Sequence, residues 1–155
     1  IKAWKIVDTQ SWRLIIAGSG DKKIEKNIRK LINNYQSIDM IGPAYNDSKV
    51  DLFRKATFFI LPSFSEGMPM AALEAMSFGI PSILSKECNL DEFINKDAAI
   101  LIKTNINDMV DTISEVIIMP ENRMYTISSK CRKIINNNYT WQIVVEKFIN
   151  KFNLI

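Results

Sequence analysis

The chain contains no histidine among its 155 residues and only two cysteines. Without histidine, Ser-His-Asp catalysis, Cys-His catalysis and the commonest zinc ligand sets are excluded. The cysteines, Cys88 and Cys131, lie far apart and lack CxxC spacing, so they indicate neither a disulfide framework nor a zinc site. A reducing cytoplasm fits this cysteine usage, and any chemistry must use carboxylates, backbone amides or another domain.

Long apolar runs are also missing, since none approaches the ~20 residues of a membrane span. Apolar residues make up 47% and charged residues 24% of the chain, which argues against disorder, collagen and coiled coil. The formal net charge of +3 includes one cluster that alternates with apolar residues at helical spacing. We interpret this cluster as a solvated helix face and expect no nucleic-acid partner. Its members are Lys22, Lys23, Lys26, Arg29 and Lys30.

The opening segment, IKAWKIV, has neither an initial methionine nor the apolar core of a signal peptide. Its residues Ile1, Trp4, Ile6 and Val7 recur at roughly helical intervals. We therefore expect this segment to be the end of a helix, and the 155 residues to be a fragment of a longer protein.

Apolar runs alternate along the chain with helical patterns. Because the strands read as continuous apolar runs, they predict a parallel sheet covered on both faces. The expected fold class is α/β, a single doubly wound domain over residues 1–155 with segments 14–17, 58–61 and 82–84 in one mostly parallel sheet. Strands are expected at 12–17, 38–41, 57–61, 82–84 and 98–102. Helices are expected after Asp21, from a capping box at Ser48 and Asp51, from Pro69 to Gly79, and at about 107–119, 121–136 and 140–152, with 136–138 as a break.

In doubly wound sheets, ligands bind beyond the carboxyl ends of the strands. The turn Gly18-Ser19-Gly20 follows the first strand and opens a helix, where unpaired amides can hold a phosphate. It lacks the third glycine of a dinucleotide fingerprint, because position 23 is Lys23. A plain strand-to-helix turn therefore stays open as the alternative.

The segment EGMPMAALE places Glu66 on a strand-end loop and Glu74 on the helix that follows. Gly67 lets backbone approach a ligand closely, and Pro69 starts a helix whose first amides point back toward the same crevice. Taken singly, either carboxylate is an ordinary surface glutamate. The combination of loop, glycine and helix start instead predicts an anion-binding site.

Three segments in this order, LIIAGSGD, DMIGPAY and FFILPSFSEGMPMAALEAMSFGIPSI, resemble the C-terminal half of the GT-B glycosyltransferases of family 4, the glycosyltransferase group 1 family. The most specific part is the pair of glutamates with its flanks. The resemblance implies two Rossmann-like domains in the whole protein. The N-terminal one, absent from this chain, would hold the acceptor, and the present one would hold the nucleotide-sugar donor.

The resemblance also implies roles for individual residues. Glu66 matches the glutamate that contacts the donor sugar and stabilises charge near the anomeric carbon, and is the expected catalytic residue. Glu74 matches the glutamate that accepts hydrogen bonds from the ribose hydroxyls. Lys2 and Lys5 do not match the basic pair that the family uses on the diphosphate. The other expected donor-binding residues are Gly67, Met68 and Pro69 at the sugar and diphosphate, Gly42, Pro43 and Ala44 at the base, and Gly18.

The expected function is the donor-binding half of a retaining transferase in cell-surface polysaccharide synthesis. Its partners would be a nucleotide diphosphate sugar, the missing N-terminal domain, and an acceptor glycan or lipid-linked sugar. No metal and no cofactor is expected, and the expected location is the cytoplasm, with the full-length protein at the inner face of the membrane. We expect this chain alone to be inactive. A non-catalytic Rossmann-like nucleotide-binding module and a GT-B nucleotide-sugar epimerase remain alternatives.

Overall fold

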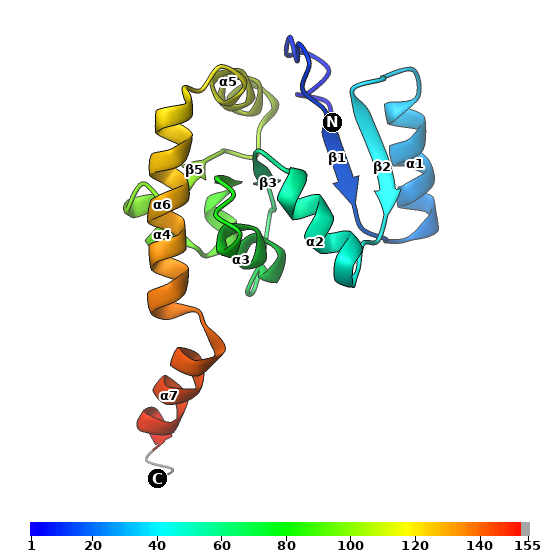
Figure 1. Cartoon of the computed structure of the whole chain (residues 1–155). Helices are drawn as coiled ribbons and strands as arrows, with labels where there is room; N and C mark the ends of the chain where they lie inside the picture. Colours follow the sequence, from blue (N-terminus) through cyan, green and yellow to red (C-terminus); the bar gives the residue numbers. More distant parts are fainter. Residues whose placement is uncertain (153–155) are drawn as a thin grey trace. The chain divides into compact units, whose positions relative to one another are not determined.

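The computed structural model describes residues 1–152 (Figure 1). Parallel strands alternate with helices, so the predicted α/β class is confirmed. The elements are β1 Leu14–Ala17, α1 Lys22–Ile32, β2 Ile38–Gly42, α2 Asn46–Lys55, β3 Phe59–Leu61, α3 Met70–Ser77, β4 Ser82–Leu84, the 3-10 helix η1 Lys86–Cys88, α4 Asp91–Asn95, β5 Ile100–Leu101, α5 Ile106–Ile117, α6 Glu121–Asn138 and α7 Trp141–Phe152.

The strands form two hydrogen-bonded sheets instead of one. Strand β1 pairs with β2, while β3, β4 and β5 form a second sheet in that order. The expectation that segment 14–17 shares a sheet with 58–61 and 82–84 is therefore wrong. Apolar runs report burial and favour parallel pairing, but they carry no information about which strands share a ladder.

The chain divides into two compact units. Unit 1 comprises Ile1–Leu52 and Asn105–Met119, and unit 2 comprises Phe53–Thr104 and the chain from Pro120 onward. In unit 1, Leu14 lies opposite Ile38 in the ladder of β1 and β2. The helix expected over IKAWKIV is instead a series of turns, with helix-like backbone bonds such as Lys5 N to Ile1 O. Buried Trp4 in these turns donates its indole N–H to Ser37 Oγ at 3.2 Å.

Unit 2 contains a contiguous apolar core built by the strands and by helices α3, α4 and α6. One face of α3 enters this core. The core therefore fixes α3, which carries Glu74 of the predicted glutamate motif, against a rigid support. The buried members are Ala72, Leu73, Met76, Leu84, Cys88, Leu90, Phe93, Ala98, Ala99, Cys131, Ile134 and Ile135.

The C-terminal end of α3 is held by α6. Ser128 Oγ donates to the carbonyl of Gly79, and Arg132 Nη2 donates to that of Phe78 at 3.0 Å. Gly79 has a φ of +76°, the left-handed conformation in which helices commonly end on glycine. These donors satisfy carbonyls that the helix itself leaves unpaired.

Several element boundaries differ from the sequence-based expectation. Helix α2 already begins at Asn46, and Ser48 lies inside it, where its Oγ bonds back to the backbone of Tyr45. The capping box at Ser48 is therefore wrong. Helix α6 continues through Asn138, whose side chain bonds Glu92 instead of breaking the helix.

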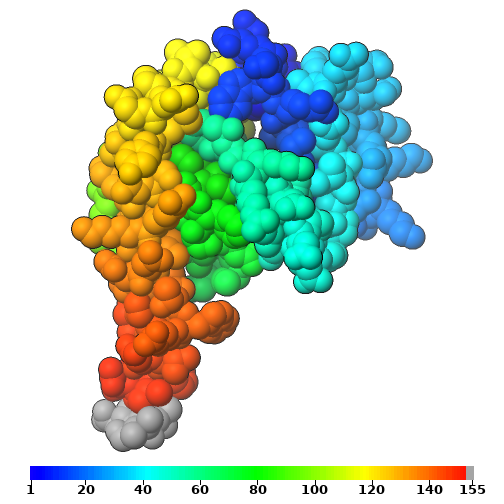
Figure 2. Space-filling model, in the orientation of Figure 1, coloured from blue at the N-terminus to red at the C-terminus, as the bar shows by residue number. Residues whose placement is uncertain are grey.

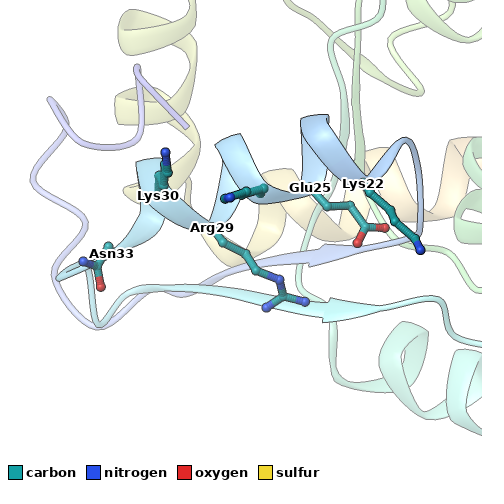
Figure 3. A pocket seen from close by; sticks show the side chains of 6 residues that line it. Lys22, Glu25, Arg29, Lys30 and Asn33 are labelled. Atoms are coloured by element: carbon teal, nitrogen blue, oxygen red, sulfur yellow. The ribbon is translucent and has the colours of Figure 1, made fainter.

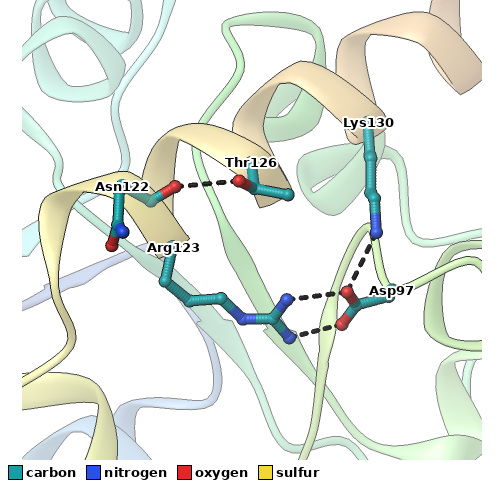
Figure 4. A network of polar contacts seen from close by, with 5 residues as sticks. All are labelled: Asp97, Asn122, Arg123, Thr126 and Lys130. Atoms are coloured by element: carbon teal, nitrogen blue, oxygen red, sulfur yellow. Dashed lines mark hydrogen bonds and ion pairs between the residues drawn. The ribbon is translucent and has the colours of Figure 1, made fainter.

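A charged network links the β5 side of unit 2 to α6 (Figure 4). Arg123 donates to Asp97 through both terminal nitrogens of its guanidinium group, Nη1 at 2.7 Å and Nη2, and Lys130 Nζ donates to the same carboxylate at 2.9 Å. These bonds, from Arg123 first, hold the pKa of Asp97 well below its ordinary value. Asp97 has a φ of +57°, so the network also fixes a left-handed turn.

Helix α7 has no buried residue, and in Figure 2 its side chains stand at the surface. Its apolar residues are nevertheless numerous, and Phe148 packs against Phe152 with ring centroids 4.7 Å apart and the ring planes tilted by 46°. Within residues 1–152, no helix is both long enough and apolar enough to cross a membrane.

We expect Gly79→Ala to lower the free energy of unfolding by more than ~1 kcal/mol, because alanine is strained at positive φ. A Cβ at this position would also lie 2.0 Å from Arg132 Nε. Urea unfolding monitored by circular dichroism measures the change. Gly20→Ala is the matched control, since its Cβ meets nothing within 4 Å. Equal stability of the two variants would contradict this account of the α3 end.

Asp97→Asn should lower the free energy of unfolding at pH 7 by about 0.5–1 kcal/mol, the modest value of a half-exposed ion network. Because the folded-state pKa is depressed, this stabilisation is present above the unfolded pKa of ~3.9 and is lost as the pH falls through the folded value. The gap between wild type and variant should therefore shrink below about pH 4.

Urea midpoints across this pH range test the Asp97 prediction. Asp111→Asn, on exposed surface of α5, is the control and should change the midpoint little at any pH. A pH-independent gap for Asp97→Asn would show that its carboxylate charge does not stabilise the fold.

Candidate functional site

In unit 1, the two predicted glycine turns lie together at the carboxyl ends of β1 and β2. The amide of Gly18 donates to the carbonyl of Gly42 at 2.8 Å, and Ala17 lies opposite Gly42 after a shift in register. Both glycines have positive φ, +144° and +76°, which side chains with a Cβ rarely adopt. Pro43 and Ala44 follow directly, in the loop before α2. The structure thus brings Gly18, Gly42, Pro43 and Ala44 into one strand-end region.

The backbone amides at the start of α1 donate hydrogen bonds to acidic side chains of the same segment. Asp21 Oδ1 accepts from the amides of Lys23 at 2.8 Å and Ile24 at 3.3 Å. Glu25 Oε1 accepts from the amide of Gly20 at 3.0 Å. The expectation of unpaired amides at this turn is therefore wrong for these groups, because acidic side chains commonly satisfy the first donors of a helix.

An open pocket is lined by side chains along α1 (Figure 3). Its lining residues come from α1 and from Asn33, the C-cap of this helix, and none belongs to the glycine turns. Helix α1 has no buried residue, which agrees with the interpretation of its basic cluster as a solvated face. The lining residues are Lys22, Glu25, Lys26, Arg29, Lys30 and Asn33.

In unit 2, Glu66 is held by hydrogen bonds at its backbone and at its side chain. Its amide donates to the carbonyl of Glu87 at 3.0 Å, and its own carbonyl accepts from Asn89 Nδ2 at 2.6 Å. Ser63 Oγ donates to Glu66 Oε1 at 2.6 Å. Glu66 is half-buried, so its carboxylate is both oriented and accessible.

These contacts follow from the pairing of β3 with β4. Leu61 lies opposite Leu84 at the ends of the two parallel strands, so the loops that follow start side by side. Ser85, just beyond β4, is fully buried and donates through Oγ to the carbonyl of Ser63 at 2.7 Å. Cys88 Sγ donates to the carbonyl of Leu61 at 3.3 Å. The sequence analysis identified neither Ser85 nor Asn89, because both act through contacts distant in sequence.

The start of α3 differs from that of α1. Pro69, expected as the first helical residue, is instead the buried N-cap, because its ψ of 82° is not helical. No side chain caps this helix. Gly67 and Met68 are exposed directly before it, and Met70, its first residue, is also exposed. The amide of Met70 donates to the carbonyl of Met68 at 2.9 Å, and that of Ala72 to the carbonyl of Pro69 at 3.0 Å. No acidic side chain lies in this first turn, so the helix dipole there favours an anion.

Glu74 lies on α3 between buried Leu73 and Ala75, and is itself half-buried. Its carbonyl accepts from Ser77 Oγ at 2.7 Å near the end of the helix. Glu66, Gly67, Met68, Pro69 and Glu74 thus belong to one continuous loop and helix of unit 2.

Other reactive groups of unit 2 have structural roles. Glu92 accepts from Lys96 at 2.8 Å, Asn138 at 3.0 Å and Tyr139 at 3.3 Å. The bond from Lys96 first, and then that from Tyr139, lowers the pKa of Glu92. Burial raises the pKa of Cys131 to about 11, so this thiol stays neutral near pH 7. Residues 1–152 contain no group of acidic or cysteine side chains placed to hold a metal ion.

The family model of glycosyl transferases group 1 matches residues 1–141. A glycosyltransferase of Haemophilus influenzae with no assigned reaction is 28% identical over 155 residues, covering 96% of this chain and 42% of its own length. The chain therefore spans less than half of that relative.

A relative from Xanthomonas oryzae, a GDP-mannose:cellobiosyl-diphosphopolyprenol alpha-mannosyltransferase, is 27% identical over 150 residues. That match covers 92% of this chain and 38% of the relative. The crystal structure of Anabaena HepE in complex with UDP-glucose superposes with a TM-score of 0.83 at 15% identity, over 99% of this chain and 43% of that protein. This similarity shows a shared fold.

Proposed function

The chain belongs to the glycosyl transferases group 1 family, and from this membership we propose that it is the donor-binding half of a retaining glycosyltransferase. The enzyme transfers a sugar from a nucleotide diphosphate sugar to a glycan or lipid-linked acceptor in cell-surface polysaccharide synthesis. The observation that carries the proposal is the placement of Glu66, an uncapped helix start at Pro69, and Glu74 on one loop-helix segment.

The chemistry of this segment suits departure of a nucleoside diphosphate. The transition state develops positive charge on the sugar ring and negative charge on the leaving phosphate. A carboxylate is favourable beside the first charge and amide donors beside the second, because groups preoriented toward developing charge need no rearrangement during the reaction. Glu66 supplies the carboxylate, and the backbone N–H groups of Gly67 and Met68, just before Pro69, supply the amide donors. Glu74 accepts from the ribose hydroxyls.

The engaged amides of α1 give the first glycine turn a different task. Gly18 and Gly42, with Pro43 and Ala44, form a backbone surface against which the base packs. Any phosphate at α1 would compete with the Asp21 and Glu25 carboxylates for the same donors. The start of α3 has no carboxylate in its first turn to compete with a phosphate, so we place the diphosphate there.

Relatives support the substrate classes without fixing the sugar. The Xanthomonas enzyme is named for GDP-mannose and a diphosphopolyprenol-linked acceptor, and Anabaena HepE holds UDP-glucose. We extend to this chain the nucleoside diphosphate sugar that the two have in common, and the lipid-linked acceptor of the Xanthomonas enzyme. An acceptor of that kind would locate the whole enzyme at the cytoplasmic face of a membrane.

The acceptor-binding domain is proposed to lie outside these residues. The chain spans 42% of the Haemophilus relative, which leaves room for a second domain of similar size. A catalytic centre between two such domains would need both of them. The 155-residue chain would then bind donor without transferring sugar.

The isolated chain should bind nucleoside diphosphates and their sugars weakly, and should transfer sugar to no acceptor. The groups at Gly67, Glu74 and the loop after β2 are present, whereas the acceptor domain is absent. Calorimetric titration with UDP-, GDP- and ADP-sugars, paired with a transfer assay, tests both statements. Turnover by this chain alone would contradict the two-domain proposal, and absence of all nucleotide binding would contradict the donor site.

In the full-length enzyme, substitutions of Glu66 and Glu74 should change different kinetic constants. Glu74→Ala removes a contact made equally in ground and transition states, so it should raise the donor KM. The expected factor corresponds to the ~1.5–3 kcal/mol of a charge-assisted hydrogen bond. Glu66→Gln preserves shape but removes charge beside the developing cation, so it should lower kcat by about 10²-fold.

Steady-state kinetics with varied donor separates these effects, and Glu87→Gln, on the exposed surface beside Asn89, is the control. Equal effects of Glu66→Gln and Glu74→Ala on KM with unchanged kcat would refute the two roles. An epimerase would instead be revealed by interconversion of nucleotide sugars without any acceptor.

A further inference from the structure

The loop that carries Glu66 rests on a second loop that the glutamate motif does not include. This second loop runs through Ser85 and the 3-10 helix η1 to Asn89. It engages the Glu66 loop at the carbonyl of Ser63 and at the amide and carbonyl of Glu66. The two loops are therefore joined by hydrogen bonds on both sides of the glutamate.

Asn89 performs two tasks in this contact. Its backbone, at φ +56°, ends η1 in the left-handed conformation, which asparagine tolerates better than most residues. Its amide donates to Lys86 O at 3.1 Å and closes that turn. The turn then directs the carboxamide Nδ2 to the carbonyl of Glu66, 2.6 Å away.

The side chain of Glu66 is oriented from its own loop. Ser63 Oγ donates to Oε1 at 2.6 Å, and within residues 1–152 no group donates to Oε2. Ser63 is in turn fixed through its carbonyl by buried Ser85. One carboxylate oxygen is thus held by the protein, while the other remains for a hydroxyl of a ligand.

We propose that Asn89 is a positioning residue for Glu66: its carboxamide fixes the Glu66 peptide, so that Ser63 can hold the carboxylate in the orientation that meets the donor sugar. This proposal rests on the proposed function for the identity of the ligand. It goes beyond that function because Asn89 lies outside the two-glutamate motif and does not touch the ligand in this role.

Two substitutions separate the backbone task of Asn89 from its side-chain task. Asn89→Gly keeps the left-handed turn but removes the donor, since glycine adopts positive φ without strain. Asn89→Asp keeps the shape and replaces the donating amide by an acceptor. Asn34→Gly is the matched control, because Asn34 also has positive φ, at +69°, and lies in unit 1.

The first measurement is amide hydrogen exchange of the isolated chain, which needs no ligand. Both Asn89 variants should accelerate exchange of the Glu66 amide at least about tenfold, because opening of the loop becomes easier. Asn34→Gly should leave this amide unchanged. Unaltered exchange in both Asn89 variants would overturn the proposal whatever the ligand turns out to be.

The second measurement compares UDP-glucose with UDP, and GDP-mannose with GDP, by calorimetry. Wild type should bind the matching nucleotide sugar more tightly than its free nucleotide. The Asn89 variants should lose about tenfold in affinity for the sugar-bearing ligand and less than twofold for the free nucleotide. A purely structural role would weaken both ligands together, and that result would overturn the positioning role.

The outcomes distinguish this proposal from the proposed function. Suppose that wild type binds no nucleotide ligand, while the Asn89 variants accelerate hydrogen exchange of the Glu66 amide. The donor-site proposal is then wrong, and the proposal that Asn89 holds the Glu66 backbone stands. If wild type prefers the nucleotide sugar and the Asn89 variants keep that preference, the donor site stands and the positioning role is wrong.

Discussion

The parallel pairing of β3 with β4 is the constraint on which the candidate site depends. Because Leu61 lies opposite Leu84, the chain leaves both strands at the same edge, and the two loops that follow meet. Ser85 can then reach Ser63, and Asn89 can reach Glu66. The glutamate motif is consequently one half of a two-loop structure, and the other half lies about twenty residues later in the sequence.

The two strand-to-helix turns look alike in sequence but differ in chemistry. Both contain glycine and precede a helix. However, α1 has Asp21 as its N-cap and Glu25 in its first turn, whereas α3 has Pro69 as its N-cap and no acidic residue in its first turn. Acidic side chains accept from the first amides of α1, whereas no side chain caps the start of α3. A glycine turn is therefore less informative than the charges of the first helical turn.

Local signals in the sequence were sufficient for most elements. The apolar run before Gly18 predicted β1, and the end of α3 at Gly79 followed from helix-stop chemistry. The glutamate motif could be placed on a strand-end loop and helix for the same reason. What could not be predicted depends on partners far along the chain: the separation of the two sheets, and the grip of Asn89 on Glu66. Asn138 shows the same limit, since its distant partner Glu92 lets the helix run on.

The accessibility of the two cysteine thiols, Cys88 and Cys131, depends on local opening of unit 2. Cys88 lies in the turn that supports Glu66, and Cys131 lies against the carbonyl of Met76 where α6 meets α3. Both are fully buried, so an alkylating reagent reaches them only when these contacts separate. Labelling kinetics at the two positions would therefore time the opening of the loop pair and of the α3–α6 contact separately, in the unmutated chain.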